Sequence, residues 1–106
     1  MTQEFATVTT SVSDQAEALS LARTLVERRL VACAQILPIH SVYRWSGKIE
    51  EAAEFLLICK IKAVDFKEVS ETISQCHGYD VPEIVMSPIS AGHAAYLAWI
   101  GECVER

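Results

Sequence analysis

The fold is decided by residues 31–62, which read VACAQILPIHSVYRWSGKIEEAAEFLLICKIK. β-Branched, aromatic and other apolar side chains dominate both halves of this segment, and Ser46-Gly47 supplies turn chemistry between them. The segment therefore predicts two long antiparallel strands, residues 31–45 and 48–62, joined by a tight turn. Pro38 cannot donate a ladder hydrogen bond, so it predicts a bend, a bulge or an edge position in the first strand.

The length of this hairpin predicts that it projects from the rest of the chain. Arms of roughly 15 residues at about 3.3 Å per residue reach close to 50 Å, whereas a domain of this size is roughly 25 to 30 Å across. We therefore expect part of the hairpin to leave the parent fold.

The segment before the hairpin predicts one strand and one helix. Residues 5–12 alternate, with Ala6, Val8, Thr10 and Val12 on one face, as in a half-buried strand. Asp14 and Glu17 have the spacing of a capping box, which begins a helix. The apolar stripe of this helix recurs at three- and four-residue steps through Ala18, Leu21, Ala22, Leu25 and Val26.

The segment after the hairpin predicts a helix, a short strand and a last helix. Asp65 and Glu68 repeat the capping-box spacing, and Gly78 is placed to end that helix as a C-cap. Residues 83–89 predict a short apolar strand, and Ser90 can cap the final helix. The expected apolar positions of the two helices are Phe66, Val69, Ile73 and Cys76 in the first, and Tyr96, Leu97, Ile100, Cys103 and Val104 in the second.

The element order is therefore βαββαβ followed by one helix, which predicts an α+β, ferredoxin-like sandwich with a four-stranded antiparallel sheet. Two helices would cover one face of this sheet. We expect few polar positions on the other face, and Tyr43, Trp45 and Phe55 add apolar surface on the hairpin. Burial against further copies of the chain would cover both surfaces, so the sequence predicts a homo-oligomer.

Length and composition exclude several classes of protein. A chain of 106 residues with 51% hydrophobic and 22% charged residues predicts one folded domain over residues 1–106. It has no apolar run long enough for a membrane span and no secretory signal pattern at its start, so we expect a cytoplasmic protein without a membrane partner. A net charge of −5 with scattered basic residues argues against nucleic acid as a partner. The widely spaced cysteines predict reduced core residues.

Four local patterns in this order resemble the CutA family of divalent-cation tolerance proteins. They are Leu30-Val31-Ala32-Cys33-Ala34-Gln35-Ile36, Trp45-Ser46-Gly47-Lys48, Cys76-His77-Gly78-Tyr79-Asp80-Val81-Pro82-Glu83-Ile84 and Tyr96-Leu97-Ala98-Trp99. The resemblance extends from about residue 7 to residue 102. It implies a ferredoxin-like homotrimer similar to PII signalling proteins, with hairpins exchanged between neighbours, and a link to copper and other divalent metal ions.

The chain departs from this family at two positions. In some members a cysteine in the first strand is associated with metal together with the loop histidine and a glutamate, and this chain has Thr10 there. It also has Gly78 where the family usually has proline.

The candidate metal ligands are His77, Asp80 and Glu83, with Cys76 adjacent. Imidazole with carboxylates suits Zn(II) or Cu(II), and a thiolate would favour Zn(II) or Cu(I). The alternative is structural: Cys76 packs in the helix, His77 caps its C-terminus and Asp80 makes a turn.

A small-ligand cleft is the second candidate site. Trp45 and Lys48 flank the hairpin turn, and Tyr79, Tyr96 and Trp99 are aromatic residues that could share a cleft between subunits. The alternative is that these side chains only pack at an interface.

Three functions remain open, and none of them is enzymatic, because no activated nucleophile or glycine-rich phosphate loop is present. The first is a trimeric protein that binds divalent metal ions and needs no other cofactor. The second is a PII-like sensor that binds an anionic metabolite through Lys48 and stacks it on Trp45 or Tyr79. The third is a trimeric scaffold that anchors another protein.

Overall fold

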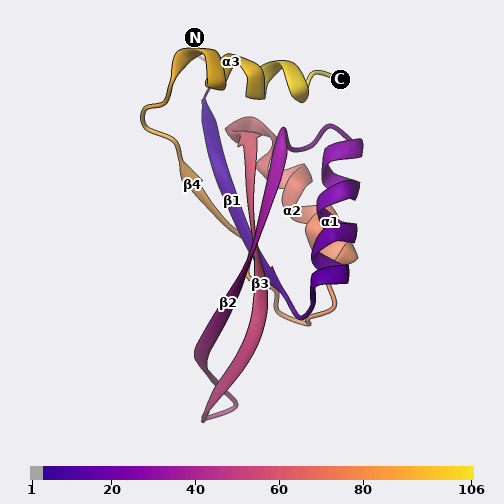
Figure 1. Cartoon of the computed structure of the whole chain (residues 1–106), viewed down its shortest axis with the longest axis vertical. Coiled ribbons are helices and arrows are strands. Elements are labelled where there is room, and N and C mark those ends of the chain that lie inside the picture. The colour runs from indigo at the N-terminus through magenta and orange to yellow at the C-terminus, as the bar shows by residue number, and fades with distance from the viewer. Residues whose placement is uncertain (1–3) are drawn as a thin grey trace.

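The computed structural model describes residues 4–106 and confirms the predicted element order (Figure 1). An α+β chain with the order βαββαβ is followed by a C-terminal helix. The elements are β1 (Phe5–Val12), α1 (Gln15–Glu27), β2 (Cys33–Trp45), β3 (Lys48–Lys62), the short 3-10 helix η1 (Ala63–Asp65), α2 (Phe66–Cys76), β4 (Val85–Pro88) and α3 (Ala94–Cys103).

The four strands form one antiparallel sheet in the order β2-β3-β1-β4. This is the ferredoxin-like order, in which β1 and β3 are central and pair from Phe5 opposite Lys62 to Val12 opposite Phe55. β2 lies at an edge of the sheet within this chain, as its proline predicts, and Pro38 faces Phe55 without interrupting the strand.

The core lies between the sheet and the two helices α1 and α2, which Figure 1 shows on the same side of the sheet. β1 places every second side chain into this core, as the alternation predicts. The fully enclosed side chains come from both layers and include Val8, Val12, Leu25, Leu57, Ile61, Val69 and Ile73. A smaller cluster of Ala32, Ile100 and Val104 holds α3 against the end of the sheet.

The start of α1 forms as predicted, but its capping is only half of a capping box. Asp14 Oδ1 accepts the backbone N–H of Glu17 at 2.8 Å, whereas the Glu17 carboxylate accepts the hydroxyl of Ser13 at 3.1 Å. The predicted apolar stripe also ends one residue early. Val26 is 43% exposed while its neighbour Leu25 is fully buried, because consecutive side chains of a helix point about 100° apart.

The second predicted capping box is wrong. The Asp65 side chain makes no capping hydrogen bond, because it pairs with Arg106 instead.

Gly78 is not a left-handed C-cap of α2, contrary to the prediction. Among residues 4–106, Gly47 is the one glycine with positive φ, and α2 ends at Cys76 as His77 turns extended. The predicted strand at residues 83–89 forms only over β4, and α3 begins at Ala94 instead of next to Ser90.

The cysteine prediction is confirmed in one respect and wrong in another. All four thiols are free. Only Cys59 is buried, however, while Cys33 and Cys103 are half-buried and Cys76 is exposed. Cys76 occupies a helical position that the periodicity assigned to the core, but as the last residue of α2 it is exposed.

The β2–β3 hairpin projects from the domain as its length predicts (Figure 1). The molecule measures 46 × 26 × 22 Å, and strand pairing continues to Trp45 opposite Lys48 at the tip. Ser46 (φ 52°) and Gly47 (φ 77°) both have left-handed backbone conformations, as expected for a two-residue hairpin turn that follows the twist of the strands. We refer to the projecting part, residues 40–53, as the arm.

The sheet face opposite α1 and α2 is more polar than predicted. The registers place Thr7, Thr9 and Lys60 on it beside Leu37 and Ile58. The prediction of few polar positions was therefore wrong, because hydroxyl residues alternate with the core residues of β1. One end of this face lies against α3, where Lys60 Nζ is 5.9 Å from the centroid of the Tyr96 ring.

No helix within residues 4–106 is long and apolar enough to cross a membrane.

Candidate functional site

A cleft of about 680 Å³ lies between the arm and the loop that follows α2. Three strands and this loop contribute to its walls. The lining residues are Ser11 from β1, Ser41, Val42, Tyr43 and Trp45 from β2, Glu54 from β3, and Gly78, Tyr79, Asp80, Val81 and Glu83 from the loop.

His77 fixes the start of this loop. Its Nε2 donates to the carbonyl oxygen of Ser11 at 2.7 Å, because a carbonyl can only accept, and its Nδ1 accepts the backbone N–H of Tyr79 at 3.0 Å. Together the two bonds require the neutral ring with the proton on Nε2. The imidazole thus ties the loop to the end of β1 and directs Tyr79 over the cleft, with the two rings 4.9 Å apart.

Tyr79 joins the loop to the floor of the cleft. Its hydroxyl donates to Glu54 Oε2 at 2.7 Å. Burial, followed by the hydrogen bond to Glu54 and the charge of that carboxylate, raises the pKa of the Tyr79 phenol above its ordinary value. The phenol therefore stays protonated and keeps donating at neutral pH.

Glu54 is an acidic residue in an otherwise apolar stretch of β3, and it is only 8% exposed. Its Oε1 has no hydrogen-bond partner within residues 4–106, and the ion pairs in that part of the chain do not involve it. A buried carboxylate without a cationic partner is costly, so the cleft floor is a site of unbalanced negative charge.

The lining of the cleft favours cations. Three carboxylates, Glu54, Asp80 and Glu83, line it together with three aromatic rings, and the lining includes no lysine, arginine or histidine. Such a surface attracts positive charge and repels anions.

The structure brings together four of the eight residues predicted from the sequence. Trp45, Tyr79, Asp80 and Glu83 line one cleft, and His77 supports the loop from behind it. Within residues 4–106 no three His, Cys, Asp or Glu side chains are placed to hold a metal ion together, so His77, Asp80 and Glu83 do not converge in a single copy.

The other three predicted residues lie outside the cleft. Lys48 is exposed at the tip of the arm. Tyr96 and Trp99 stack on each other in α3, with ring centroids 5.4 Å apart, and the Tyr96 hydroxyl lies 3.7 Å from Cys33 Sγ.

The sequence interpretation missed Tyr43, Glu54, Ser11 and Ser41 as lining residues. One signal for Glu54 was present, because it is the single charged position in Ala52-Ala53-Glu54-Phe55-Leu56-Leu57. No sequence signal could have identified the two serines, which are ordinary strand residues until the loop folds next to them.

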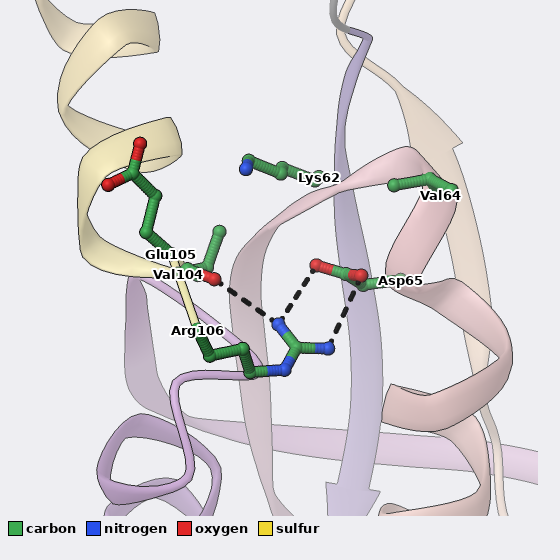
Figure 2. Close-up of a pocket in the computed structure, with 6 residues that line it drawn as sticks. All are labelled: Lys62, Val64, Asp65, Val104, Glu105 and Arg106. Carbon is green, nitrogen blue, oxygen red and sulfur yellow. Dashed lines mark hydrogen bonds and ion pairs between the residues drawn. The ribbon is translucent and has the colours of Figure 1, made fainter.

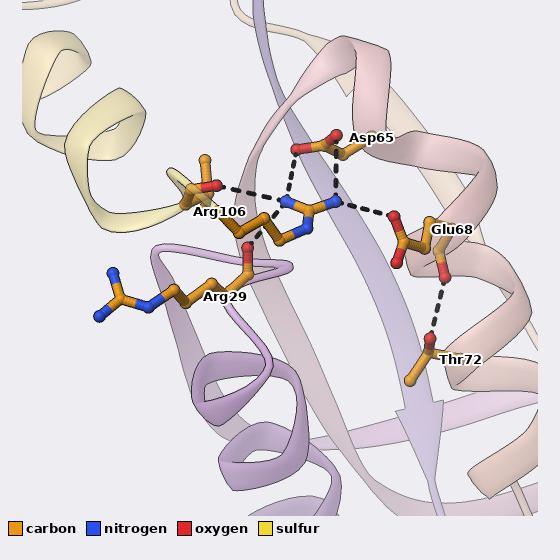
Figure 3. Close-up of polar contacts among 6 residues, drawn as sticks. Arg29, Asp65, Glu68, Thr72 and Arg106 are labelled. Carbon is orange, nitrogen blue, oxygen red and sulfur yellow. Dashed lines mark hydrogen bonds and ion pairs between the residues drawn. The ribbon is translucent and has the colours of Figure 1, made fainter.

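A second pocket, of about 550 Å³, lies where the C-terminus meets α2 and is lined by Lys62, Val64, Asp65, Val104, Glu105 and Arg106 (Figure 2). The Arg106 guanidinium forms part of its wall. This group bonds to the Asp65 carboxylate at 3.3 Å, to Glu68 Oε1 at 2.8 Å and to the carbonyl oxygen of Arg29 at 3.0 Å (Figure 3). It also bonds to the carbonyl oxygen of Val104 at 3.2 Å (Figure 2). The bonds to Glu68 and Asp65 raise the pKa of Arg106. Because the guanidinium is already satisfied, this pocket is a structural junction.

Comparison with protein families and curated proteins gives one consistent result. Residues 6–103 match the model of the family described as CutA1 divalent ion tolerance protein. The divalent-cation tolerance protein CutA of Archaeoglobus fulgidus is 43% identical over 89 residues, which are 84% of this chain and 87% of that protein. The CutA homologue of Xenopus laevis is 41% identical over 88 residues, which are 82% of this chain but only 58% of that protein.

The fold is also shared with solved structures. The structure described as the periplasmic divalent cation tolerance protein CutA from Archaeoglobus fulgidus superposes with a TM-score of 0.94 at 38% identity, over 95% of this chain and 99% of that one. The divalent cation tolerance protein of Thermus thermophilus gives a TM-score of 0.92 at 38% identity, over 95% of this chain and 99% of that one.

Proposed function

Since this chain belongs to the CutA1 divalent ion tolerance protein family, we propose that it binds divalent metal ions, Cu(II) or Zn(II), and contributes to metal-ion tolerance without being an enzyme. The observation that carries this proposal is the charge of the cleft. Its carboxylates Glu54, Asp80 and Glu83 are not balanced by any basic side chain in the lining. The names of the relatives likewise describe cation tolerance and not a reaction.

Asp80 and Glu83 are the proposed ligands. Both are exposed and belong to one loop, so a hydrated cation can reach them. Because a single copy offers no set of three ligands within residues 4–106, water or a neighbouring copy would complete the coordination. His77 would join as a ligand through Nδ1 once that nitrogen releases the N–H of Tyr79.

We further propose that the protein works as a homotrimer. The arm carries apolar side chains that nothing within residues 4–106 covers, such as Ile49 at 68% exposure. The outer edge of β2 is also unpaired among residues 4–106, and an open edge is a template for pairing with another copy. Sedimentation equilibrium checks this directly, and a mass of one copy at micromolar concentration would refute it.

Metal titration by calorimetry tests the site. We expect Asp80→Asn combined with Glu83→Gln to weaken Cu(II) and Zn(II) binding by about tenfold or more, because two charge-assisted ligands are lost. Glu71→Gln is the matched control, because Glu71 is an exposed carboxylate of α2 outside the cleft. Equal affinities of the double variant and the wild type would remove the proposed site.

The role of His77 is separable from that of the carboxylates. Nitrogen hyperfine coupling in the electron paramagnetic resonance spectrum of the Cu(II) complex reports imidazole ligation. If His77 is a ligand, the coupling is lost in His77→Gln, whereas a purely supporting role leaves the spectrum of the bound copper unchanged.

The two alternative functions receive no support from the cleft. An anionic metabolite would meet three carboxylates there, and Lys48, its expected partner, lies outside the lining. A scaffold role predicts binding of another protein, which a pulldown would detect. For the compartment we propose the cytoplasm, although the Archaeoglobus fulgidus relative is described as periplasmic. Cell fractionation tests that assignment.

A further inference from the structure

The aromatic half of the cleft is not explained by metal binding. Tyr43, Trp45 and Tyr79 line the cleft beside the carboxylates. Metal ions of this class are held by imidazole, thiolate or carboxylate groups, and an indole ring provides no ligand atom. Aromatic faces combined with negative charge instead recognise organic cations, whose charge lies on a partly apolar group.

The size of the cleft points the same way. Its volume of about 680 Å³ is in the range that small organic ligands occupy in proteins. A coordinated metal ion with its waters would fill only a small part of that space. The cleft therefore has room for a charged group together with several carbon atoms.

Glu54 supplies an independent observation. It is only 8% exposed and lines the cleft floor. The Tyr79 hydroxyl satisfies Oε2, while Oε1 has no partner within residues 4–106. A carboxylate in the wall of a cleft, with one oxygen that meets no donor or cation among the described residues, is poised for a ligand that brings both.

We propose that this cleft binds a primary alkylammonium ion, whose N–H groups donate to Glu54 Oε1 and whose alkyl carbons pack against the rings of Tyr43, Trp45 and Tyr79. The hydroxyls of the two cleft serines are additional acceptors. The ammonium group balances the charge of Glu54, and the aromatic faces stabilise the cation and shield its alkyl chain from water.

This site goes beyond metal binding and does not depend on it. The proposed metal ligands Asp80 and Glu83 lie on the exposed loop, whereas the ammonium site rests on Glu54 at the floor. Occupation of one site by a cation would lower the affinity of the other for a second cation through charge repulsion.

Calorimetric titration of the full chain with n-butylammonium, in its native assembly and in the presence of EDTA, tests the proposal. Butan-1-ol is the neutral probe of similar shape, and tetramethylammonium is a cation that lacks N–H donors. We expect butylammonium to bind at least about tenfold more tightly than butanol, because a charged hydrogen bond is worth that factor or more. Tetramethylammonium should bind several-fold more weakly than butylammonium.

Two variants locate the site. Glu54→Gln keeps the side-chain shape and an acceptor for Tyr79, so we expect the fold to persist while butylammonium affinity falls about tenfold or more. Tyr43→Leu removes an exposed ring and should lower the affinity about threefold or more without changing the melting temperature by more than a few degrees. Glu71→Gln, outside the cleft, should leave binding unchanged.

Three results would overturn the proposal. They are equal binding of butylammonium and butanol, unchanged binding in Glu54→Gln, and tetramethylammonium binding as tight as butylammonium. Because EDTA removes metal ions, failure of this test is distinct from failure of the metal titration. A protein that binds copper but not butylammonium would retain only the metal proposal.

Discussion

The Arg106 junction predicts a large stability effect from a single surface-accessible side chain. Its guanidinium joins three elements, because it bonds to Asp65 and Glu68 at the start of α2, to the carbonyl of Arg29 after α1, and to the carbonyl of Val104 at the end of α3. Arg106→Ala removes all of these bonds at once.

The magnitude follows from the exposure of each partner. The Glu68 side chain is 60% exposed, so that pair contributes at most about 0.5 kcal/mol. Asp65 is 17% exposed and is bound in a fork, which makes it worth about 1 kcal/mol, and the two carbonyl acceptors together add a similar amount because water can replace part of each bond. We expect Arg106→Ala to lower the free energy of unfolding by about 2 kcal/mol.

Urea denaturation monitored by circular dichroism measures this change, with all proteins at the same concentration because an oligomer unfolds in a concentration-dependent way. Arg106→Lys should recover less than half of the loss, since an ammonium cannot bridge the same set of acceptors. Arg23→Ala is the control, because Arg23 is an exposed arginine of α1 that forms no ion pair within residues 4–106. A loss below about 0.5 kcal/mol for Arg106→Ala, or full recovery by lysine, would refute this reasoning.

Three further predictions concern single positions. Thr10 is fully buried, and its Oγ1 has no hydrogen-bond partner within residues 4–106. Thr10→Val should therefore raise the free energy of unfolding, measured by urea titration, by about 1 kcal/mol. A destabilised variant would show that the Thr10 hydroxyl has a hydrogen-bond partner. Gly47 has φ 77° with open space around its Cβ position, so Gly47→Ala should cost about 1 kcal/mol from backbone strain alone, and a neutral result would contradict the left-handed turn. Burial, and secondarily the neighbouring Cys33 thiol, raises the pKa of Cys59 to about 12. At pH 8 the Cys59 thiol is therefore protonated and should resist a disulfide reagent until the protein unfolds. The exposed Cys76 should react first. Equal labelling rates of the two thiols would contradict the packing of β3.

Local patterns predicted the elements well where a single interaction decides them. The alternation in β1 predicted that strand with its observed bounds, because the period of two directly sets which side chains are buried. The apolar and β-branched content after Ser46-Gly47 likewise predicted β3 with its observed bounds. The spacing of Asp14 and Glu17 predicted the start of α1, since the acceptor and the N–H it binds are three residues apart.

The same kind of pattern failed where a distant residue competes. Asp65 has the capping-box spacing, yet its carboxylate bonds to Arg106, which is 41 residues away in the sequence. Cys76 has helical core spacing, yet it is exposed as the last residue of α2. Local spacing contains neither piece of information.

By itself, the sequence determined the element order, the ferredoxin-like class, the projecting hairpin and the family, because short-range periodicity, turn chemistry and local motifs encode them. Only the tertiary structure decided the cleft. It joins Tyr79 to Glu54 across 25 residues and His77 to Ser11 across 66, and it leaves Lys48, Tyr96 and Trp99 elsewhere. The physical reason is that a site is a convergence of side chains from separate elements, and convergence depends on the path of the whole chain through space.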